Sequence, residues 1–360
     1  MAVYFDSKRN SWYVSTYFKA SDGRQQRKLR RGFATKKEAQ NWEVSFLSNT
    51  ESTETVGTFG EIAEIYLGDM QNRVRRSTML TKRSILQTKV IPAFRNREIS
   101  EITPRDIRHW QDDMIRRGFS PSYLRTLQEQ LSAVFNYAVK FYGLAKNPCP
   151  TAGTMGSSAS EMEIWTVEEF NRFLKTVENS PDFHAAYMIL FWTGLRVGEL
   201  LALTIEDIDF ENKTLRINKS LQRIGGEDVI TEPKTPKSNR IIQMPELLID
   251  EIQKYLSDFP EAKPEDRLVS SLTKTALERR LKKGIYATGL PDIHPHCLRH
   301  SHTALIASLG ATPVEAAERL GHENVSTTLN VYSHVLPGRQ QTIASELDKI
   351  YKKSKGEQSA

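Results

Sequence analysis

Hydrophobic and polar residues alternate near the start of the chain, and this pattern predicts β-strands. Residues 12–19 alternate and are rich in Tyr, Val and Thr, as is typical of a strand. Asp22-Gly23 tolerates the positive φ angles of a hairpin turn, so residues 24–33 are expected to form the next strand. Residues 35–46 open with the capping box Thr-Lys-Lys-Glu and continue as a helix. The first 50 residues therefore predict a small sheet with one helix.

Residues 58–147 change to the 3.6-residue period of helices. Apolar residues recur with this spacing in four stretches, and Thr103-Pro104 and Ser120-Pro121 each place an N-cap before proline at the first helical position. The pattern predicts a helical bundle that ends at Asn147-Pro148-Cys149-Pro150. Polar runs at 49–57 and 151–160 are the predicted linkers.

The remainder of the chain predicts a third unit, which is mainly helical with a small β insert. Thr166-Val167-Glu168-Glu169 caps a helix, and Leu215–Ile217, Val229-Ile230 and Ile241-Ile242 suggest one short antiparallel sheet. Helices are expected to fill the rest. The predicted fold is therefore multidomain and mainly α with small β elements, divided into domains at 1–50, 58–150 and 161–350.

The amino-acid composition limits the number of domains and the class of protein. The 360 residues are enough for two or three domains with cores of their own, and 39% hydrophobic with 26% charged residues suits a soluble globular protein. We find no apolar run of membrane-spanning length, and the first ten residues lack the apolar core of a signal peptide. Cys149 and Cys297 are too few to staple so long a chain, so we expect reduced thiols in a cytoplasmic protein.

Positive charge is concentrated in the first 150 residues. Ten basic and four acidic residues give +6 over 1–50, fifteen and eleven give +4 over 51–150, and twenty-five and twenty-nine give −4 over 151–360. This asymmetry indicates a polyanionic partner for the N-terminal parts, although an ordinary solvated surface or an edge strand protected from aggregation would look similar. The candidate DNA-binding residues are Arg24, Arg27, Lys28, Arg30 and Arg31 in the strand segment, and Arg73, Arg75, Arg76, Lys82 and Arg83 near one helix start.

Arginines and histidines in the third unit form a candidate site for phosphodiester chemistry. Attack on a phosphodiester builds negative charge on two oxygens, and the planar, permanently charged arginine fork suits them. Arg196 follows a glycine turn at a helix start, and Glu199 lies on the same helical face to hold it. His296 and Arg299 project together at i, i+3. Zinc binding by His296 and His300 is weakly supported, because no nearby carboxylate or Cys-x-x-Cys completes a site.

Four separated motifs carry a resemblance to the tyrosine recombinases, the phage-type integrases. They are Thr-Gly-Leu-Arg196, His296-x-x-Arg299, Leu-Gly-His322 and Tyr332, in the family's order and usual spacing. The resemblance implies that Tyr332 is the nucleophile that forms a 3′-phosphotyrosyl link, and that His322 donates a hydrogen bond to the transition state. His296 is the expected proton acceptor, because a phenol has a pKa near 10 and needs a base. His294, His300 and His302 are expected to pack or to support the other residues.

The same resemblance supplies the other roles and the partners. The segment 232–240 resembles the family's β-hairpin lysine motif, with Lys234 as the expected general acid and Lys237 second. The first 50 residues resemble a three-stranded arm-binding domain, and 58–150 a core-binding domain. No cofactor and no metal are expected. The implied partners are double-stranded DNA at core and arm sites, three further copies in a homotetramer, an excision factor and a host DNA-bending protein at the bacterial nucleoid.

Two other functions share parts of this pattern. A type IB topoisomerase has the same constellation but relaxes DNA as a monomer, and the basic N-terminal module favours the recombinase. A non-catalytic DNA-binding regulator could keep the fold, but the full set of site residues argues against it.

Overall fold

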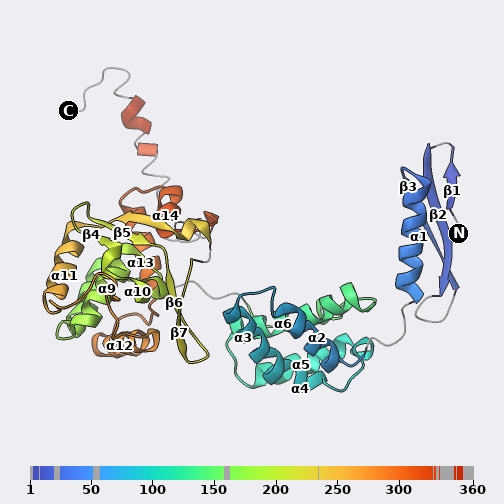
Figure 1. The fold of residues 1–360 in the computed structure, drawn as a ribbon, viewed down its shortest axis with the longest axis horizontal. Helices are drawn as coiled ribbons and strands as arrows, with labels where there is room; N and C mark the ends of the chain where they lie inside the picture. Colours follow the sequence, from blue (N-terminus) through green and yellow to red (C-terminus); the bar gives the residue numbers. More distant parts are fainter. Residues whose placement is uncertain are drawn as a thin grey trace. The chain divides into compact units, whose positions relative to one another are not determined.

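The computed structural model describes residues 3–7, 9–19, 25–51, 57–157, 163–233, 235–326, 328–329, 332, 344–345 and 347–351. Contacts between residues divide the chain into two compact units, 1–160 and 161–360. Both are mainly helical with small sheets, which confirms the predicted fold class (Figure 1). Within the described ranges, no helix is both long and apolar enough to cross a membrane.

The chain starts with a three-stranded antiparallel sheet of order β1-β2-β3. Helix α1 lies along one face of this sheet (Figure 1). Val14, Phe33 and Ala39 form the buried core between them, and Trp12 and Trp42 pack against it. The predicted hairpin turn at 21–23 lies outside the described residues. The elements are β1 (Val3–Asp6), β2 (Ser11–Lys19), β3 (Gln25–Phe33) and α1 (Lys36–Glu51).

A helical bundle follows in the same unit, and local capping signals set its boundaries. The hydroxyls of Thr58, Thr103 and Ser120 each accept a backbone N–H at a helix start, and proline at the first position follows the last two. The second of its helices begins at Arg76 and continues through a π-helical turn at Leu86–Val90. The elements are α2 (Phe59–Met70), α3 (Arg76–Ile85), η1 (Leu86–Val90), α4 (Ile91–Phe94), η2 (Ile99–Glu101), α5 (Pro104–Arg116), α6 (Pro121–Phe141) and α7 (Cys149–Ala152).

The chain continues to pack against the bundle beyond Asn147–Pro150, where the sequence predicts the end of the bundle. The side-chain oxygen of Asn147 accepts the backbone N–H of Cys149 at 2.9 Å, and its amide nitrogen donates to Asn136 at 2.8 Å. These bonds turn the chain into the short helix α7, whose Ala152 joins the bundle core together with Met155. The segment predicted as a linker from residue 151 therefore still packs against the bundle at its beginning.

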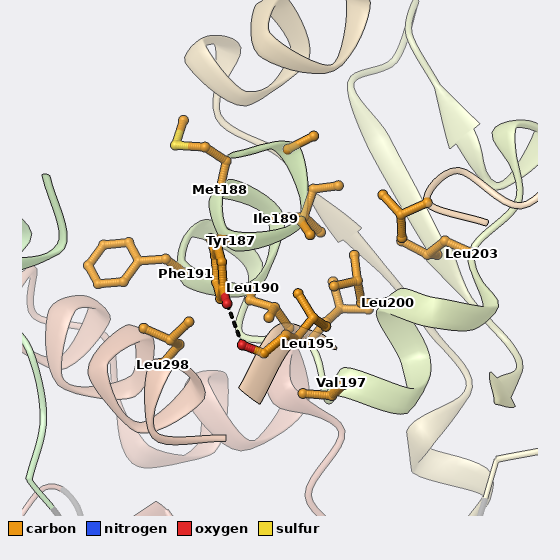
Figure 2. Close-up of a cluster of buried hydrophobic side chains, with 14 of the residues drawn as sticks. Tyr187, Met188, Ile189, Leu190, Phe191, Leu195, Val197, Leu200, Leu203 and Leu298 are labelled. Atoms are coloured by element: carbon orange, nitrogen blue, oxygen red, sulfur yellow. Dashed lines mark hydrogen bonds between the residues drawn. The ribbon is translucent and has the colours of Figure 1, made fainter. Parts of the chain in front are cut away.

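Helix α9 lies at the centre of the second unit. Its residues from Ala185 to Phe191 are all buried, and Figure 2 shows Met188, Ile189 and Phe191 leaving the helix in different directions. Leu298 of α13 joins the same core. A helix that is apolar on all sides requires such a central position. The helices are α8 (Val167–Leu174), η3 (Lys175–Val177), α9 (Pro181–Thr193), α10 (Val197–Ala202), α11 (Glu246–Ser257), α12 (Lys274–Thr288), α13 (Cys297–Ser308) and α14 (Pro313–Leu320).

The strands of this unit form two sheets rather than the single one predicted. Strands β4 (Ile208–Asp209), β5 (Thr214–Ile217) and β8 (Arg240–Gln243) form one sheet in the order β4-β5-β8. Strands β6 (Ser220–Ile224) and β7 (Glu227–Thr231) pair only with each other within the described residues. Gly225 and Gly226, both at positive φ, close this local hairpin, so Val229-Ile230 pairs with the neighbouring strand and not with β8.

Candidate active site

Arg196 lies in the turn between α9 and α10. Gly194 ends α9 in the left-handed conformation, with φ of 68°, and Arg196 is the N-cap of α10. The guanidinium donates to Glu199 at 2.7 Å (Nη1 to Oε1), and the backbone N–H donates to the other carboxylate oxygen at 2.9 Å. Nη2 also lies 3.4 Å from the carbonyl oxygen of Gly321. The turn and the carboxylate together hold Arg196, which stays 37% exposed.

Arg299 is the largest fully buried side chain of the described structure, at 1% exposure. Its Nη1 donates to the carbonyl of Gly194 at 2.7 Å, and its Nη2 donates to the carbonyl of Leu320 at 2.6 Å. These carbonyls end α9 and α14, where the helix dipoles present negative charge. Burial and the nearby charge of Arg196 lower the pKa of Arg299 to about 9, so the guanidinium remains protonated at neutral pH.

The side chains of Arg196 and Arg299 therefore both reach the C-terminal end of α14. Both contact the carbonyl groups at the end of α14, Arg299 at Leu320 and Arg196 at Gly321. His322 follows directly, because Gly321 ends α14 in the left-handed conformation, with φ of 69°. The structure thus brings two arginines and one histidine of the predicted site together around the turn that ends α14.

The histidines beside the arginines are held in the neutral form. Desolvation, together with the positive charges of Arg299 and Arg196, lowers the pKa of His322 to about 3. Its Nδ1 lies 2.8 Å from the hydroxyl of Thr328. Desolvation and its charged neighbours also lower the pKa of His296, to about 4, and its ring meets that of His300 edge to face at 5.1 Å. A neutral imidazole offers one donor and one acceptor nitrogen.

The hydroxyl of Tyr332 does not lie with the arginines. It donates to the carbonyls of Ala311 at 2.9 Å and Thr312 at 3.2 Å, which precede α14. The ring is 7% exposed and packs against α13 and α14. Burial raises the pKa of Tyr332, and the carboxylate of Glu315 adds to the effect. At 1.5 Å per residue, α14 separates this hydroxyl from the carbonyl groups that hold the arginines by roughly 12 Å.

The two candidate acids lie in the segment between β7 and β8. Lys234 lies outside the described residues. Lys237 belongs to the short helix η5 (Pro236–Ser238), is exposed, and its Nζ lies 3.4 Å from the carbonyl of Glu323, next to His322. Among the described residues, no group of three His, Cys, Asp or Glu side chains is arranged to hold a metal ion. Both cysteines are free and buried.

The pairing of β2 with β3 divides the basic residues of the N-terminal sheet between its two faces. Residues directly opposite each other in an antiparallel pair share a face. Lys28 and Arg30 lie opposite Thr16 and Val14, on the side of α1. The Arg30 guanidinium stacks over Trp42 there, 5.0 Å from the ring centroid.

Arg27 and Arg31 lie opposite Tyr17 and Tyr13, on the face away from α1. Tyr4 stacks on Tyr13 there, with 5.4 Å between ring centroids. We define the open face as Tyr4, Tyr13, Tyr17, Arg27 and Arg31. Arg24 lies outside the described residues.

The basic residues of the bundle also differ in what they contact. Lys82 donates to the hydroxyl of Tyr66 at 2.6 Å and to Gln130 at 2.7 Å, so its ammonium joins α3 to α2 and α6. Arg73 pairs with Asp69 at 3.1 Å on the surface. Arg75 and Arg76 are exposed at the start of α3, whereas Arg83, predicted near a helix start, is exposed in the last turn of α3. Lys82 is therefore part of the internal hydrogen bonding of the bundle, which the charge pattern alone does not reveal.

Two arginines outside the predicted set complete the site. Arg240, 9% exposed at the start of β8, makes a forked contact with Glu199, at 3.2 Å and 3.0 Å. Arg319 of α14 donates from Nε to Nε2 of His302, whose Nδ1 donates to the carbonyl of Phe191. The sequence did not predict either arginine as a site residue, because basic residues in a polar segment are expected to be exposed to solvent. The only available signal was the alternation of β8, which places Arg240 and Ile242 on its buried side.

Comparisons with known proteins identify the relatives of this chain. The model of the phage integrase family matches residues 163–339, the N-terminal SAM-like domain of phage integrases matches 58–115, and an arm DNA-binding domain matches 2–50. The ICEBs1 integrase of Bacillus subtilis is 28% identical over 340 residues, which cover 90% of this chain and 88% of that protein. A putative prophage phiRv2 integrase of Mycobacterium tuberculosis is 30% identical over 301 residues, which cover 81% and 78%.

Solved structures show the same fold. The Tn1549 transposon integrase in complex with a circular intermediate DNA aligns with a TM-score of 0.70 at 24% identity, over 81% of this chain and 99% of that one. The lambda integrase tetramer bound to a Holliday junction aligns with a TM-score of 0.59 at 17% identity, over 91% and 94%. The resemblance predicted from the motifs is thereby confirmed, and the chain belongs to the phage integrase family of tyrosine recombinases.

Proposed function

We propose that this chain cuts double-stranded DNA at a specific site through a covalent link between Tyr332 and a 3′ phosphate, and rejoins it to a new partner strand. In this way it integrates and excises a mobile element or prophage. The observation that carries the proposal is the meeting of Arg196, Arg299 and His322 at the end of α14, two fixed cations beside a neutral hydrogen-bonding ring.

The arginines are suited to the transition state of phosphoryl transfer. Charge develops on the two non-bridging oxygens during attack, and donors fixed in advance stabilise it without reorganising. Arg196 and Arg299 are fixed by the carbonyl groups of Gly194, Leu320 and Gly321. Enclosure of Arg299 strengthens its field, because little water remains to screen it.

The neutral histidines take the roles of donor and acceptor. If Nδ1 of His322 accepts the Thr328 hydroxyl proton, Nε2–H is the free donor toward a phosphate oxygen. His296, neutral at physiological pH, accepts the proton of the Tyr332 phenol as the oxygen attacks phosphorus. The phosphorus–oxygen bond to the 5′ side then breaks, and Lys234 gives the leaving 5′ oxygen its proton, with Lys237 as the second candidate.

Tyr332 must leave its present contacts before it attacks. Its hydroxyl donates to two carbonyls at the start of α14, roughly 12 Å from the arginines. The cleavage step therefore requires a conformational change, in which DNA or a neighbouring protomer brings the phenol to the phosphate.

The N-terminal parts hold the DNA. Residues 58–150 bind the core site, with Arg75, Arg76 and Arg83 at its surface, and residues 1–50 bind a separate arm site through the open face. Four protomers act together, because exchange between two duplexes requires four active sites. An excision factor and a host DNA-bending protein set the direction, at the nucleoid in a bacterial cytoplasm.

Replacement of the nucleophile tests the proposal. Tyr332→Phe should abolish covalent protein–DNA adducts on a nicked core-site DNA while it leaves the Kd for that DNA within about twofold, since only one hydroxyl is lost. Tyr286→Phe is the matched control, because Tyr286 is a 94% exposed tyrosine of the same unit. Adducts that persist in Tyr332→Phe would assign the attack to another residue. Recombination of two DNA molecules by the wild type, beyond relaxation of one, separates a recombinase from a topoisomerase.

A further inference from the structure

Arg240 connects three elements of the site through one buried guanidinium. Nη1 and Nη2 bind the two carboxylate oxygens of Glu199 on α10, and Nη1 also donates to the carbonyl of Ser238 at 3.1 Å. Nε donates to the carbonyl of Arg319 at 2.8 Å, in the last turn of α14. Four of the five N–H donors of this side chain therefore have protein acceptors.

Glu199 is shared between Arg240 and Arg196. Each carboxylate oxygen accepts one bond from the Arg240 fork and one from Arg196, through its guanidinium or its backbone N–H. Burial alone would raise the pKa of Glu199, but the hydrogen bonds and charge of Arg240, with the charge of Arg196, hold it below its ordinary value. The carboxylate is therefore ionised at neutral pH.

This sharing has an electrostatic consequence for the phosphate. Glu199 and Arg196 alone would form a neutral pair, and the field of a neutral pair falls off steeply. With Arg240 the three groups carry a net charge of +1. Glu199 can then orient Arg196 without cancelling the positive charge that the transition state requires.

Arg240 also fixes the position of the turn that carries His322. A Cβ on Gly321 would lie 3.1 Å from both Cδ and Nη1 of Arg240, so that turn packs directly against the guanidinium. The bond from Nε to Arg319 holds the preceding residues. Displacement of Arg240 would thus disturb Arg196 and His322 together.

We infer that Arg240 is a positioning residue for the cleavage reaction, which offsets the charge of Glu199 so that Arg196 stays cationic toward the phosphate, and which fixes the turn before His322. Arg240 is not assigned a contact with the DNA, because four of its five N–H donors bind protein acceptors, whereas Arg299 gives two donors to the carbonyls of Gly194 and Leu320. The inference rests on the proposed function of Arg196.

Restoration of the net charge is the decisive test. Arg240→Gln brings the three groups to zero, and single-turnover cleavage of a nicked core-site DNA should slow by about 10–100-fold, less than the ~10²–10³-fold typical of a lost transition-state donor. The double variant Arg240→Gln/Glu199→Gln returns the net charge to +1 and keeps an oxygen that accepts from Arg196. It should cleave at least about fivefold faster than Arg240→Gln, with the Kd unchanged.

The pH profile gives a second measurement. Without Arg240, burial raises the pKa of Glu199, so protonation at low pH should restore the charge of Arg196. The ratio of wild-type to Arg240→Gln rates should therefore shrink from about pH 8 to about pH 5.5. Arg240→Lys, which keeps the cation but loses the fork, should cleave within about tenfold of wild type with a flat ratio, and it remains informative if the glutamine variant unfolds.

A matched control separates this role from simple support of the fold. Lys219→Gln removes a cation from Asp207, a fully buried carboxylate elsewhere in the same unit, with which Lys219 pairs at 2.8 Å. It should lower stability but not the cleavage rate of the folded fraction. Full activity of Arg240→Gln, or a double variant no faster than the single one, would overturn the inference. Absence of adducts from the wild type itself would instead refute the proposed function.

Discussion

The packing around Gly194 predicts that a side chain at this position destabilises the second unit. Its φ of 68° is one that residues with a Cβ adopt at a cost of roughly 1 kcal/mol. A Cβ at this position would lie 2.7 Å from a methyl carbon of Leu320 and 2.8 Å from the ring of His302. Overpacking of this kind costs about 1–3 kcal/mol more. Gly194→Ala should therefore destabilise the second unit by roughly 2–4 kcal/mol.

Gly289 offers a matched control in the same unit. It also ends a helix, α12, in the left-handed conformation, with φ of 64°, but no atom lies within 4 Å of the position that its Cβ would take. Gly289→Ala should thus cost only the conformational part, roughly 1 kcal/mol. Urea denaturation of the full chain, followed by circular dichroism, gives both values from the midpoint and slope of the transition.

Activity distinguishes the two glycines further. The carbonyl of Gly194 accepts Nη1 of Arg299, so a shifted backbone should slow cleavage in Gly194→Ala, whereas Gly289→Ala should cleave at the wild-type rate. A loss of stability in Gly194→Ala no greater than that in Gly289→Ala would show that the close contacts with Leu320 and His302 are absent in solution.

Three further predictions concern other parts of the chain. Lys234→Ala should regain cleavage on DNA with a 5′-bridging sulfur, because the sulfur leaves without a proton. If this DNA does not restore cleavage, the general acid is another group. Arg31→Ala, on the open face, should weaken arm-site binding about tenfold or more in a filter-binding assay, whereas Lys28→Ala should change it less, and the opposite order would reverse the assignment of faces. A hydrogen bond from Arg97 holds the pKa of Asp106 well below its usual range, so its stabilising effect is present above about pH 4 and is lost as the pH falls. Asp106→Asn should therefore lower the thermal midpoint more at pH 7 than at about pH 2.5, and an equal loss at both pH values would mean that the carboxylate charge does not contribute.

Local signals predicted the helices well, because their causes lie within a few residues. The N-cap and proline at Thr103-Pro104 and Ser120-Pro121 set the starts of α5 and α6 as expected. The pairing of β7 was predicted wrongly, because β-strands of four or five residues carry little information about their partners. There the turn at Gly225-Gly226 decided the outcome.

The residues of the candidate site also divide into those that the sequence predicted and those that it did not. The motif residues could be found because the family keeps them in a fixed order. The role of Arg240 could not, because its acceptors lie 41 residues away at Glu199 and 79 away at Arg319. The contacts of the Tyr332 hydroxyl were equally hidden, since backbone carbonyls leave no trace in the residue types.

The reliance of Arg299 on carbonyl oxygens also bears on how this protein can change over evolutionary time. Every amino acid supplies the same carbonyl group, so most side-chain replacements along α9 and α14 leave the ligands of Arg299 in place. An insertion or deletion of one residue within either helix would instead rotate its end by about 100° and withdraw the oxygen. The lengths of α9 and α14 are therefore more tightly constrained by Arg299 than the side chains at their exposed positions, whereas the buried positions of α9 must stay apolar to keep the core.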